Sequence, residues 1–322
     1  MYVPFGFSNI ITFDVFGLEK NLNTISERKK SALSKAPLEL TYDAKILSMC
    51  ILFIYRNPNA DAKTYRLIIA SNRDETYKRP ASPANYWEEH PECLGGTDME
   101  PGKEGGTWLA LSIKGKAAVI LNLVNGGSSM DSPKKGRGFL ITNFITSNES
   151  IESYLSNLHK ENIDQPYNPY CLVLFNLNNA DVHYLSSCTK NAGHKICNSD
   201  IIGIGNSGLS HPYKKVEVGK EYFKRIVQDV DTSKQDDLID KLIQFLKSKK
   251  RCLPDEELQK RCPMRYEDLS SIFVSGKEYG TRTHSILLID GSNHVTFVEE
   301  TLMPDFTWKR QRFQNNLICK NT

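Results

Sequence analysis

The stretch that decides the fold reads Met49-Cys-Ile-Leu-Phe-Ile-Tyr55 and, after a turn at Asn57-Pro-Asn59, Tyr65-Arg-Leu-Ile-Ile-Ala-Ser-Asn-Arg-Asp-Glu75. Both runs are short and rich in β-branched and aromatic residues, which predicts strands at Cys50–Tyr55 and Tyr65–Ala70. The polar run from Ser71 to Glu75, at the end of the second strand, is either a solvated turn or, with Cys50, part of the polar centre of the domain. Glycines and aromatics follow it as far as Leu109, and they predict a long ordered loop of the kind that often carries function.

The rest of the chain alternates between hairpins and helices. Strand-like runs occur at 107–113, 116–124, 170–175, 182–185, 201–204, 284–289 and 294–298. Lys114-Gly115 and Asp290-Gly291 are hairpin turn signals between such runs. Apolar residues at helical spacing predict helices over 151–158, 218–226 and 238–246, the last with a cap at Ser233. This order favours antiparallel sheets covered by helices, an α+β fold in one domain over residues 49–322.

The first 48 residues differ from this pattern. Residues 1–18 are apolar and aromatic, with Asp14 but no positive charge before Lys20, and residues 26–37 are polar and lysine-rich like a linker. A secretory leader starts with basic residues and a mitochondrial presequence is arginine-rich, so neither fits well. We expect a poorly ordered extension, or alternatively a second initiation site at Met49.

Composition excludes several classes of protein. The 322 residues are 39% apolar and 25% charged with a net charge of +3, which is typical of a globular chain without the basic stripe of a nucleic-acid-binding protein. The densest basic run, 247–251, fits the end of a helix. Eight cysteines include no CxxC pair, which favours reduced thiols in a cytosol-like compartment. No apolar stretch approaches the roughly 20 residues needed to span a bilayer.

Cys50 is the first candidate for chemistry. If Met49 is removed, Cys50 carries a thiol and an α-amine together, and an amine titrating near ~8 can serve as base for the thiol. A nearby arginine would lower the pKa of that thiol. The alternative is a buried strand cysteine that packs as a small hydrophobic residue.

Several motifs occur in one order along the chain. They are Met49-Cys50, Asn72-Arg73-Asp74-Glu75, Arg79-Pro80, Leu94-Gly95-Gly96, Glu104-Gly105-Gly106-Thr107-Trp108-Leu109 and Tyr279-Gly280-Thr281-Arg282-Thr283. Together they resemble the NRDE family, and within it the transport and Golgi organisation 2 homologues of animals, from Met49 to about Trp308. That family is similar to N-terminal-nucleophile hydrolases, so the resemblance implies a four-layer αββα sandwich with Cys50 at the mouth between the sheets.

The resemblance also implies site residues. Arg73 would attend the thiol and Asp74 would be the nearby carboxylate. Asn122 and Asn206 would stabilise an oxyanion, and Arg282 would be a second cation in the pocket. Each has a structural alternative, since the asparagines could cap turns and Arg282 could pair with a surface acid.

Two functions follow as expectations. In a chain that begins at Met1 the nitrogen of Cys50 is a peptide nitrogen and no base, which favours a binding protein that holds an acyl, lipid or haem ligand between the sheets. The family implies support of secretion and Golgi organisation, with cytoplasmic, Golgi or mitochondrial location. The alternative is a cysteine amidohydrolase or acyltransferase that is active once Cys50 is exposed. A third reading is an interaction partner without a small ligand.

Weaker signals remain. Cys262-Pro263 is a dipeptide of the kind seen at haem-responsive sites, although it also occurs by chance, and no cofactor is required by the fold. Cys188, His194 and Cys197 lack the paired spacing of a zinc site, so a polar loop is the better interpretation. His211 follows Asn206 and either lines the same pocket or starts a helix.

Overall fold

The computed structural model describes residues 49–123, 134–161, 166–188 and 194–318, and the description below covers these ranges. The predicted extension over residues 1–48 lies outside them. Within them, no helix is long and apolar enough to cross a bilayer.

Thirteen strands form two antiparallel sheets in the described part of the chain. The six-stranded sheet has the order β10-β1-β2-β11-β12-β13 and the seven-stranded sheet the order β3-β4-β5-β6-β7-β8-β9. The first sheet comprises β10 (Ile201–Ile204), β1 (Ile51–Arg56), β2 (Tyr65–Thr76), β11 (Tyr279–Asp290), β12 (His294–Leu302) and β13 (Trp308–Asn316). The second comprises β3 (Ala81–Tyr86), β4 (Cys93–Asp98), β5 (Leu109–Ser112), β6 (Lys116–Asn122), β7 (Tyr170–Asn176), β8 (Asp181–Ser186) and β9 (Lys195–Ile196).

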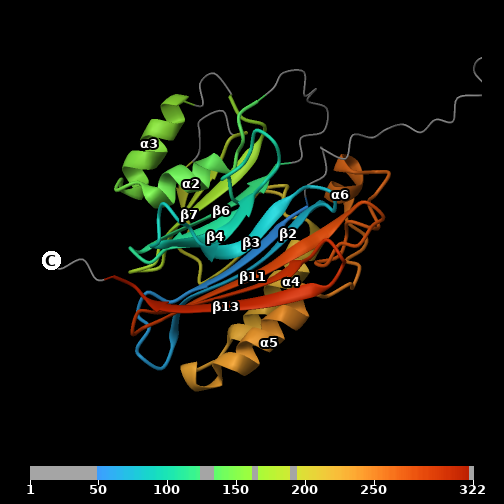
Figure 1. The fold of residues 1–322 in the computed structure, drawn as a ribbon. Helices are drawn as coiled ribbons and strands as arrows, with labels where there is room; N and C mark the ends of the chain where they lie inside the picture. Colours follow the sequence, from blue (N-terminus) through green and yellow to red (C-terminus); the bar gives the residue numbers. More distant parts are fainter. Residues whose placement is uncertain (1–48, 124–133, 162–165, 189–193, 319–322) are drawn as a thin grey trace, which may run out of the picture. The chain divides into compact units, whose positions relative to one another are not determined.

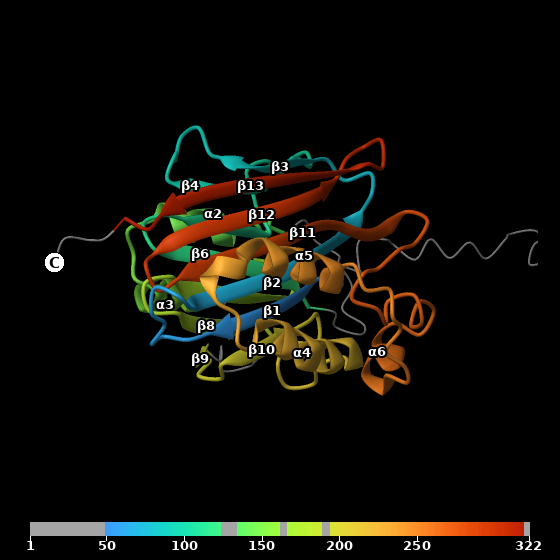
Figure 2. The same ribbon diagram turned by 90° about the horizontal axis from the view of Figure 1, so that it is seen from below.

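Helices lie on the two outer faces (Figure 1). Their bounds are α2 (Phe139–Thr146), α3 (Ile151–Glu161), α4 (Lys214–Val227), η3 (Thr232–Lys234), α5 (Gln235–Leu246) and α6 (Glu256–Arg261). Viewed from below, α4 and α5 lie in front of the six-stranded sheet (Figure 2), while α2 and α3 lie against the seven-stranded sheet.

Three apolar clusters separate the layers. The first joins β1, β2 and β11 to α4 and α5, and includes Phe53 and Phe223. The second fills the space between the two sheets and includes Leu52 and Val173. The third joins the seven-stranded sheet to α2 and α3, and includes Phe144. Three cores between four layers confirm the predicted α+β, four-layer αββα arrangement.

Strand β1 shows how the sequence builds two of these cores at once. Successive side chains of a strand point to opposite faces, so Leu52 and Ile54 enter the core between the sheets while Ile51 and Phe53 enter the core under α4 and α5. A strand that is buried on both faces reads as a continuous apolar run, as 51–54 does.

The prediction of a turn at Ser71–Glu75 is wrong. Strand β2 continues to Thr76, and its partner β11 pairs with it along this length. Polar side chains stay in a buried strand because each finds a partner there, as Ser71 does by donating to the carbonyl of Ile51 at 3.0 Å.

Other boundaries also differ from expectation. The long loop predicted after Glu75 contains strands β3 and β4, whose glycines and prolines masked the strand signal. The cap expected at Ser233 is instead Asp231, which accepts the Ser233 backbone N–H at the start of η3. Strand β13 has mostly exposed, charged side chains and so gave no apolar pattern.

Candidate functional site

Three of the predicted residues, Asn206, Cys50 and Arg73, align in one row when the registers of the six-stranded sheet are extended to Cys50. In the β1–β2 ladder Ile51 faces Asn72, and in the β1–β10 ladder Leu52 faces Ile204. Extending both registers to Cys50 places Arg73 on one side of it and Asn206 on the other. The row lies where β1 begins, with Cys50 in the core between the sheets.

The Cys50 thiol contacts the backbone of the next strand. The amide N–H of Asp74 donates to Cys50 Sγ at 3.4 Å, and Sγ lies 3.8 Å from the Asp74 carbonyl oxygen. Cys50 is 8% exposed. The sulfur therefore accepts one backbone hydrogen bond from Asp74 and donates another to it, which holds the side chain against β2.

Asn206 and Asn122 connect the two sheets beside this row. Asn206 Nδ2 donates to the Asn122 carbonyl oxygen at 2.6 Å, and Asn206 is fully buried. Among the described residues the Asn206 Oδ1 atom has no hydrogen-bond partner. The structure therefore brings together both asparagines that the sequence singled out, although Asn122 takes part through its backbone.

Arg73 lies flat on an indole ring. Its guanidinium carbon is 4.1 Å from the centroid of the Trp108 ring, a cation–π contact across the space between the sheets. A side chain at Gly96 would come within 2.5 Å of that ring, so this glycine leaves room for it. Thr107 Oγ1 donates to the Gly96 carbonyl at 2.6 Å, and this bond holds the residue before Trp108 against β4. The glycine-rich motifs thus support the position of Arg73.

Four arginines gather around this end of the sheets with two carboxylates. Arg73 Nη2 is 4.0 Å and Arg79 Nε is 3.8 Å from Glu75 Oε2, and Arg79 also binds both carboxylate oxygens of Asp98. Arg282 Nη1 donates to the carbonyl oxygens of Thr76, at 3.1 Å, and of Arg79. Arg137, the fourth, donates to the Pro169 carbonyl at 2.9 Å. We call Arg73, Arg79, Arg137 and Arg282 the arginine cluster.

The cluster has excess positive charge. Burial, and then repulsion from Arg73, lowers the pKa of Arg282. Burial lowers the pKa of Arg137 to about 10, although Glu75 raises it. Glu299, which is buried nearby and accepts the Ala84 N–H at 2.7 Å, has a pKa that burial raises and that Arg73 lowers. Four guanidinium groups therefore share three nearby carboxyl groups, those of Glu75, Asp98 and Glu299.

The Asp74 carboxylate does not join Arg73. It projects from the opposite face of β2, under α4, where Thr281 Oγ1 donates to Asp74 Oδ1 at 2.7 Å. Burial raises the pKa of Asp74 to about 7, while the ammonium of Lys215 lowers it. Lys215 donates to the carbonyls of Ser271 at 3.2 Å and of Met49 at 3.5 Å. Alternation along the strand, which a predicted turn would have removed, explains this correction to the expected position of Asp74.

The Asn72 side chain also lies on the face of the six-stranded sheet that is covered by α4 and α5. Its Nδ2 donates to the carbonyls of Leu246 at 2.9 Å and Ile272 at 3.0 Å, and its Oδ1 is 2.6 Å from His284 Nδ1. The end of α5 is therefore tied to the sheet by this amide. Within the run 72–75, the side chains of Asn72 and Asp74 lie on the face of β2 that is covered by α4 and α5. The side chains of Arg73 and Glu75 lie on the face toward the other sheet.

The weaker candidates lie apart from the row. Cys262 is 5% exposed in the core beneath α4 and α5, and burial raises the pKa of its thiol to about 11. His194 Nε2 is 2.7 Å from His183 Nδ1 and their rings stack, while Cys197 is buried in the core between the sheets. In the ranges that the structure describes, no three His, Cys, Asp or Glu side chains are grouped to hold a metal ion.

Sequence reasoning missed several residues of this region as site residues. Trp108 and Arg79 stood in the quoted motifs without a role, and a period-two count along β2 would have paired Arg73 with the interior. Arg137, Lys215 and Glu299 stand outside any motif and meet the site only through long-range packing.

Comparisons with known proteins cover nearly the whole described part. The family model for Transport and Golgi organisation 2 matches residues 49–304. The human "Transport and Golgi organization protein 2 homolog" is 35% identical over 262 residues, 79% of this chain and 94% of that protein. The Drosophila melanogaster "Transport and Golgi organization protein 2" is 33% identical over 283 residues, 83% of this chain and 98% of that protein.

Solved structures give more distant matches. A conjugated bile acid hydrolase from Clostridium perfringens is 10% identical, covers 84% of each chain and has a TM-score of 0.33. A Caenorhabditis elegans orthologue of N-acylethanolamine-hydrolyzing acid amidase is 11% identical with a TM-score of 0.36, covering 74% of this chain and 92% of that one.

Proposed function

Because this chain belongs to the Transport and Golgi organisation 2 family, we propose that it supports protein secretion and Golgi organisation by holding a ligand between its two sheets. The ligand carries an anionic group and an apolar body, as acyl compounds, lipids and haem do. The anion binds the arginine cluster, and the apolar body lies beside Cys50 at the mouth between the sheets, where it borders the apolar cluster that fills the space between them.

One observation carries this proposal, namely the charge balance of the arginine cluster. Arg73 and Arg282 are only 7% and 8% exposed, and burying a guanidinium without a full counter-charge is costly. A carboxylate or phosphate group on a ligand would supply the missing charge. Arginine binds both groups through paired hydrogen bonds, which makes such ligands the best fit.

A titration tests the proposal directly. Palmitoyl-coenzyme A and haemin are titrated into the protein, and Arg73→Leu is compared with Arg251→Leu, an exposed arginine far along the chain from the cluster. Loss of a charge-assisted hydrogen bond costs about 2 kcal/mol, so the Arg73 variant should bind about thirtyfold more weakly while the control binds as wild type. Equal binding by both variants, with an unchanged circular dichroism spectrum, would refute the proposal.

If the ligand is haem, its binding at the arginine cluster should not depend on Cys262. Because that thiol is buried on the far side of the six-stranded sheet, haem held through its propionates at the arginine cluster should give the same Soret band in Cys262→Ala as in wild type. A Soret shift in Cys262→Ala would instead assign the iron to that thiol.

The row Asn206–Cys50–Arg73 favours one second candidate, a cysteine amidohydrolase or acyltransferase. The thiol would attack an amide carbonyl, passing its proton to the Cys50 amine, to give a thioester and release the substrate amine. Water or a second amine would then take the acyl group. With Met49 attached the amine is absent, and the Met49 N–H instead donates to the Tyr279 hydroxyl at 2.6 Å.

Two measurements decide for or against this candidate. Intact mass of the protein from its own cells shows whether a form starting at Cys50 exists. Labelling by a cysteine-directed amide probe should then occur in that form and disappear in Cys50→Ser. A mature chain that always retains Met49 would rule the hydrolase out.

Location belongs to the same proposal. We propose a cytoplasmic location with association to the Golgi or mitochondria, and the name of the family, which refers to Golgi organisation, supports the Golgi part. Fractionation of cells that express the tagged chain tests this, and recovery only in the medium would overturn it.

A further inference from the structure

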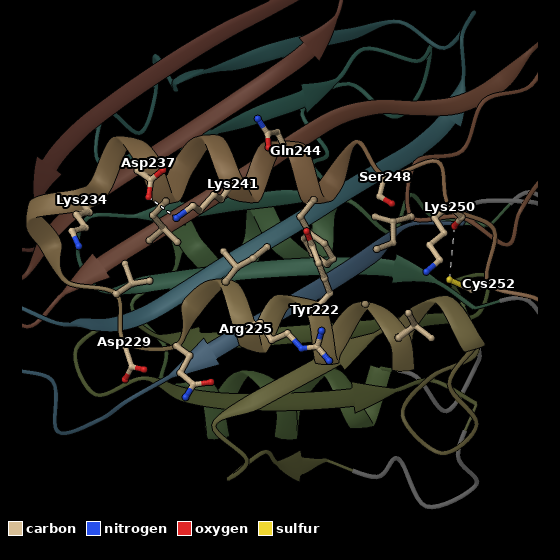
Figure 3. A pocket seen from close by; sticks show the side chains of 18 residues that line it. Tyr222, Arg225, Asp229, Lys234, Asp237, Lys241, Gln244, Ser248, Lys250 and Cys252 are labelled. Atoms are coloured by element: carbon tan, nitrogen blue, oxygen red, sulfur yellow. Dashed lines mark hydrogen bonds and ion pairs between the residues drawn. The ribbon is translucent and has the colours of Figure 1, made fainter.

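A groove with a volume of about 830 Å³ lies between α4 and α5 (Figure 3). Its size is within the range of roughly 300–1,000 Å³ typical of sites for small molecules. It lies on the helix side of the six-stranded sheet, whereas Cys50 faces the space between the sheets. It is therefore a separate feature from the arginine cluster.

The floor of the groove is apolar. Leu238 and Phe245 of α5 are buried beneath it, and Ile226 and Val230 are half-buried along its length. Tyr222 reaches from α4 across to α5, and its ring centroid lies 5.6 Å from that of Phe245 (Figure 3). Although it belongs to this apolar surface, Tyr222 is 54% exposed, so the groove leaves a large aromatic face uncovered.

The walls carry more positive than negative charge. Arg225, Lys234, Lys241 and Lys250 line the groove, against Asp229 and Asp237. Lys241 pairs with Asp237 at 2.7 Å. In the part of the chain that the structure describes, the other three cations form no salt bridge, although Lys234 interacts electrostatically with Asp231.

The two carboxylates of the groove, Asp229 and Asp237, lie at one end of it, and Cys252 marks the other end (Figure 3). Lys250 lies beside that residue in Figure 3. Burial raises the pKa of the Cys252 thiol, Lys250 and Lys215 lower it, and Asp255 raises it.

We propose that the α4–α5 groove is a second binding site, for an anionic amphiphile. The apolar chain lies along Ile226, Val230 and Phe245, and the anionic head lies at the Lys250 end. A neutral apolar molecule would gain nothing from the unpaired cations, and a cationic amphiphile would be repelled by them. A carboxylate and a phosphate monoester share the required chemistry.

The test uses dodecanoate and dodecyl phosphate below their micelle concentrations, with dodecyltrimethylammonium as the cationic counterpart. Binding to the full chain is measured by isothermal titration calorimetry. The double variant Arg225→Glu, Lys250→Glu is compared with Lys224→Glu, Lys309→Glu, which changes net charge equally outside the groove. Reversing two exposed cations should weaken binding of both anions about tenfold, since each exposed pair contributes about 1 kcal/mol or less.

Comparing dodecanoate with dodecyl phosphate identifies the preferred head group, which is that of the amphiphile with the tighter binding. Equal weakening by both double variants would mean a general charge effect and would overturn the site. Tight binding of the cationic amphiphile would also overturn it. Weakening by Arg73→Leu alone would place the ligand in the arginine cluster, which refutes the second site while supporting the proposed function.

Discussion

The buried carboxyl group of Asp74 makes the stability of this protein depend on pH in a direction that can be worked out. Burial raises the pKa of Asp74 in the folded protein to about 7, compared with its ordinary value of 3.8. The folded chain therefore keeps a proton in a pH range where the unfolded chain has lost it. The free energy of unfolding must fall as pH rises from about 4 to about 7.

The size of this fall follows from the same values. A pKa difference of about 3 units corresponds to about 4 kcal/mol, with a slope approaching 1.4 kcal/mol per pH unit inside the window. Asp74→Asn cannot ionise, and its side-chain oxygen can still accept from Thr281. The variant should be close to wild type in stability near pH 4 and more stable by up to about 4 kcal/mol at pH 8.

Lys215 does not reverse the sign. Burial lowers its pKa and the Asp74 carboxylate raises it, so the Asn variant lowers it further. A base whose folded pKa is depressed gains stability as pH rises above that value. This makes the difference between variant and wild type larger at high pH rather than smaller.

Urea unfolding followed by circular dichroism at pH 4.5, 6, 7 and 8 measures the difference. Asp305→Asn is the control, because Asp305 is exposed and its pKa is lowered by hydrogen bonds from Thr307. A stability difference between wild type and Asp74→Asn that stays flat with pH, or that favours wild type at pH 8, would show that the carboxyl is not held neutral by burial.

Two further substitutions test the packing around the six-stranded sheet. Asn72→Ala removes the amide that binds the carbonyls of Leu246 and Ile272, and should lower the free energy of unfolding by about 3 kcal/mol in urea titrations; a loss below about 1 kcal/mol would contradict the tie between α5 and the sheet. Gly219→Ala places a methyl group 2.5 Å from Phe53 Cζ, so it should lower the urea midpoint by the equivalent of about 1–3 kcal/mol despite the better helix propensity of alanine, and a raised midpoint would show that Phe53 can move.

The strands that are buried on one or two faces could be predicted because their residues are apolar and β-branched. Strand β1 is of this kind. The predicted second strand ended too early, at Ala70, whereas β2 continues to Thr76. The second half of β2 is polar, and its partners, such as His284 and Thr281, are more than 200 residues away along the chain. Exposed β13 has no apolar period at all, since its side chains pair with charges on α5, as Arg310 does with Asp240.

The candidate site divides in the same way. Residues within motifs, such as Cys50 and Arg73, could be singled out because polar residues beside apolar strands are conspicuous. The direction in which Arg73 faces could not be predicted, because a turn at Ser71–Glu75 has no alternation of side chains between two faces. Arg137 reaches the cluster through tertiary packing, and a single arginine in a loop gives no local signal of that contact.

The continuity of β2 through residues 72–75 has a consequence for anyone who substitutes this motif as a block. Substitutions at positions 72 and 74 remove hydrogen bonds that support α4 and α5, whereas substitutions at positions 73 and 75 change the charge beside Cys50. Deleting all four side chains together therefore confounds misfolding with loss of binding. Single substitutions at 73 and 75, made with 72 and 74 intact, separate the two.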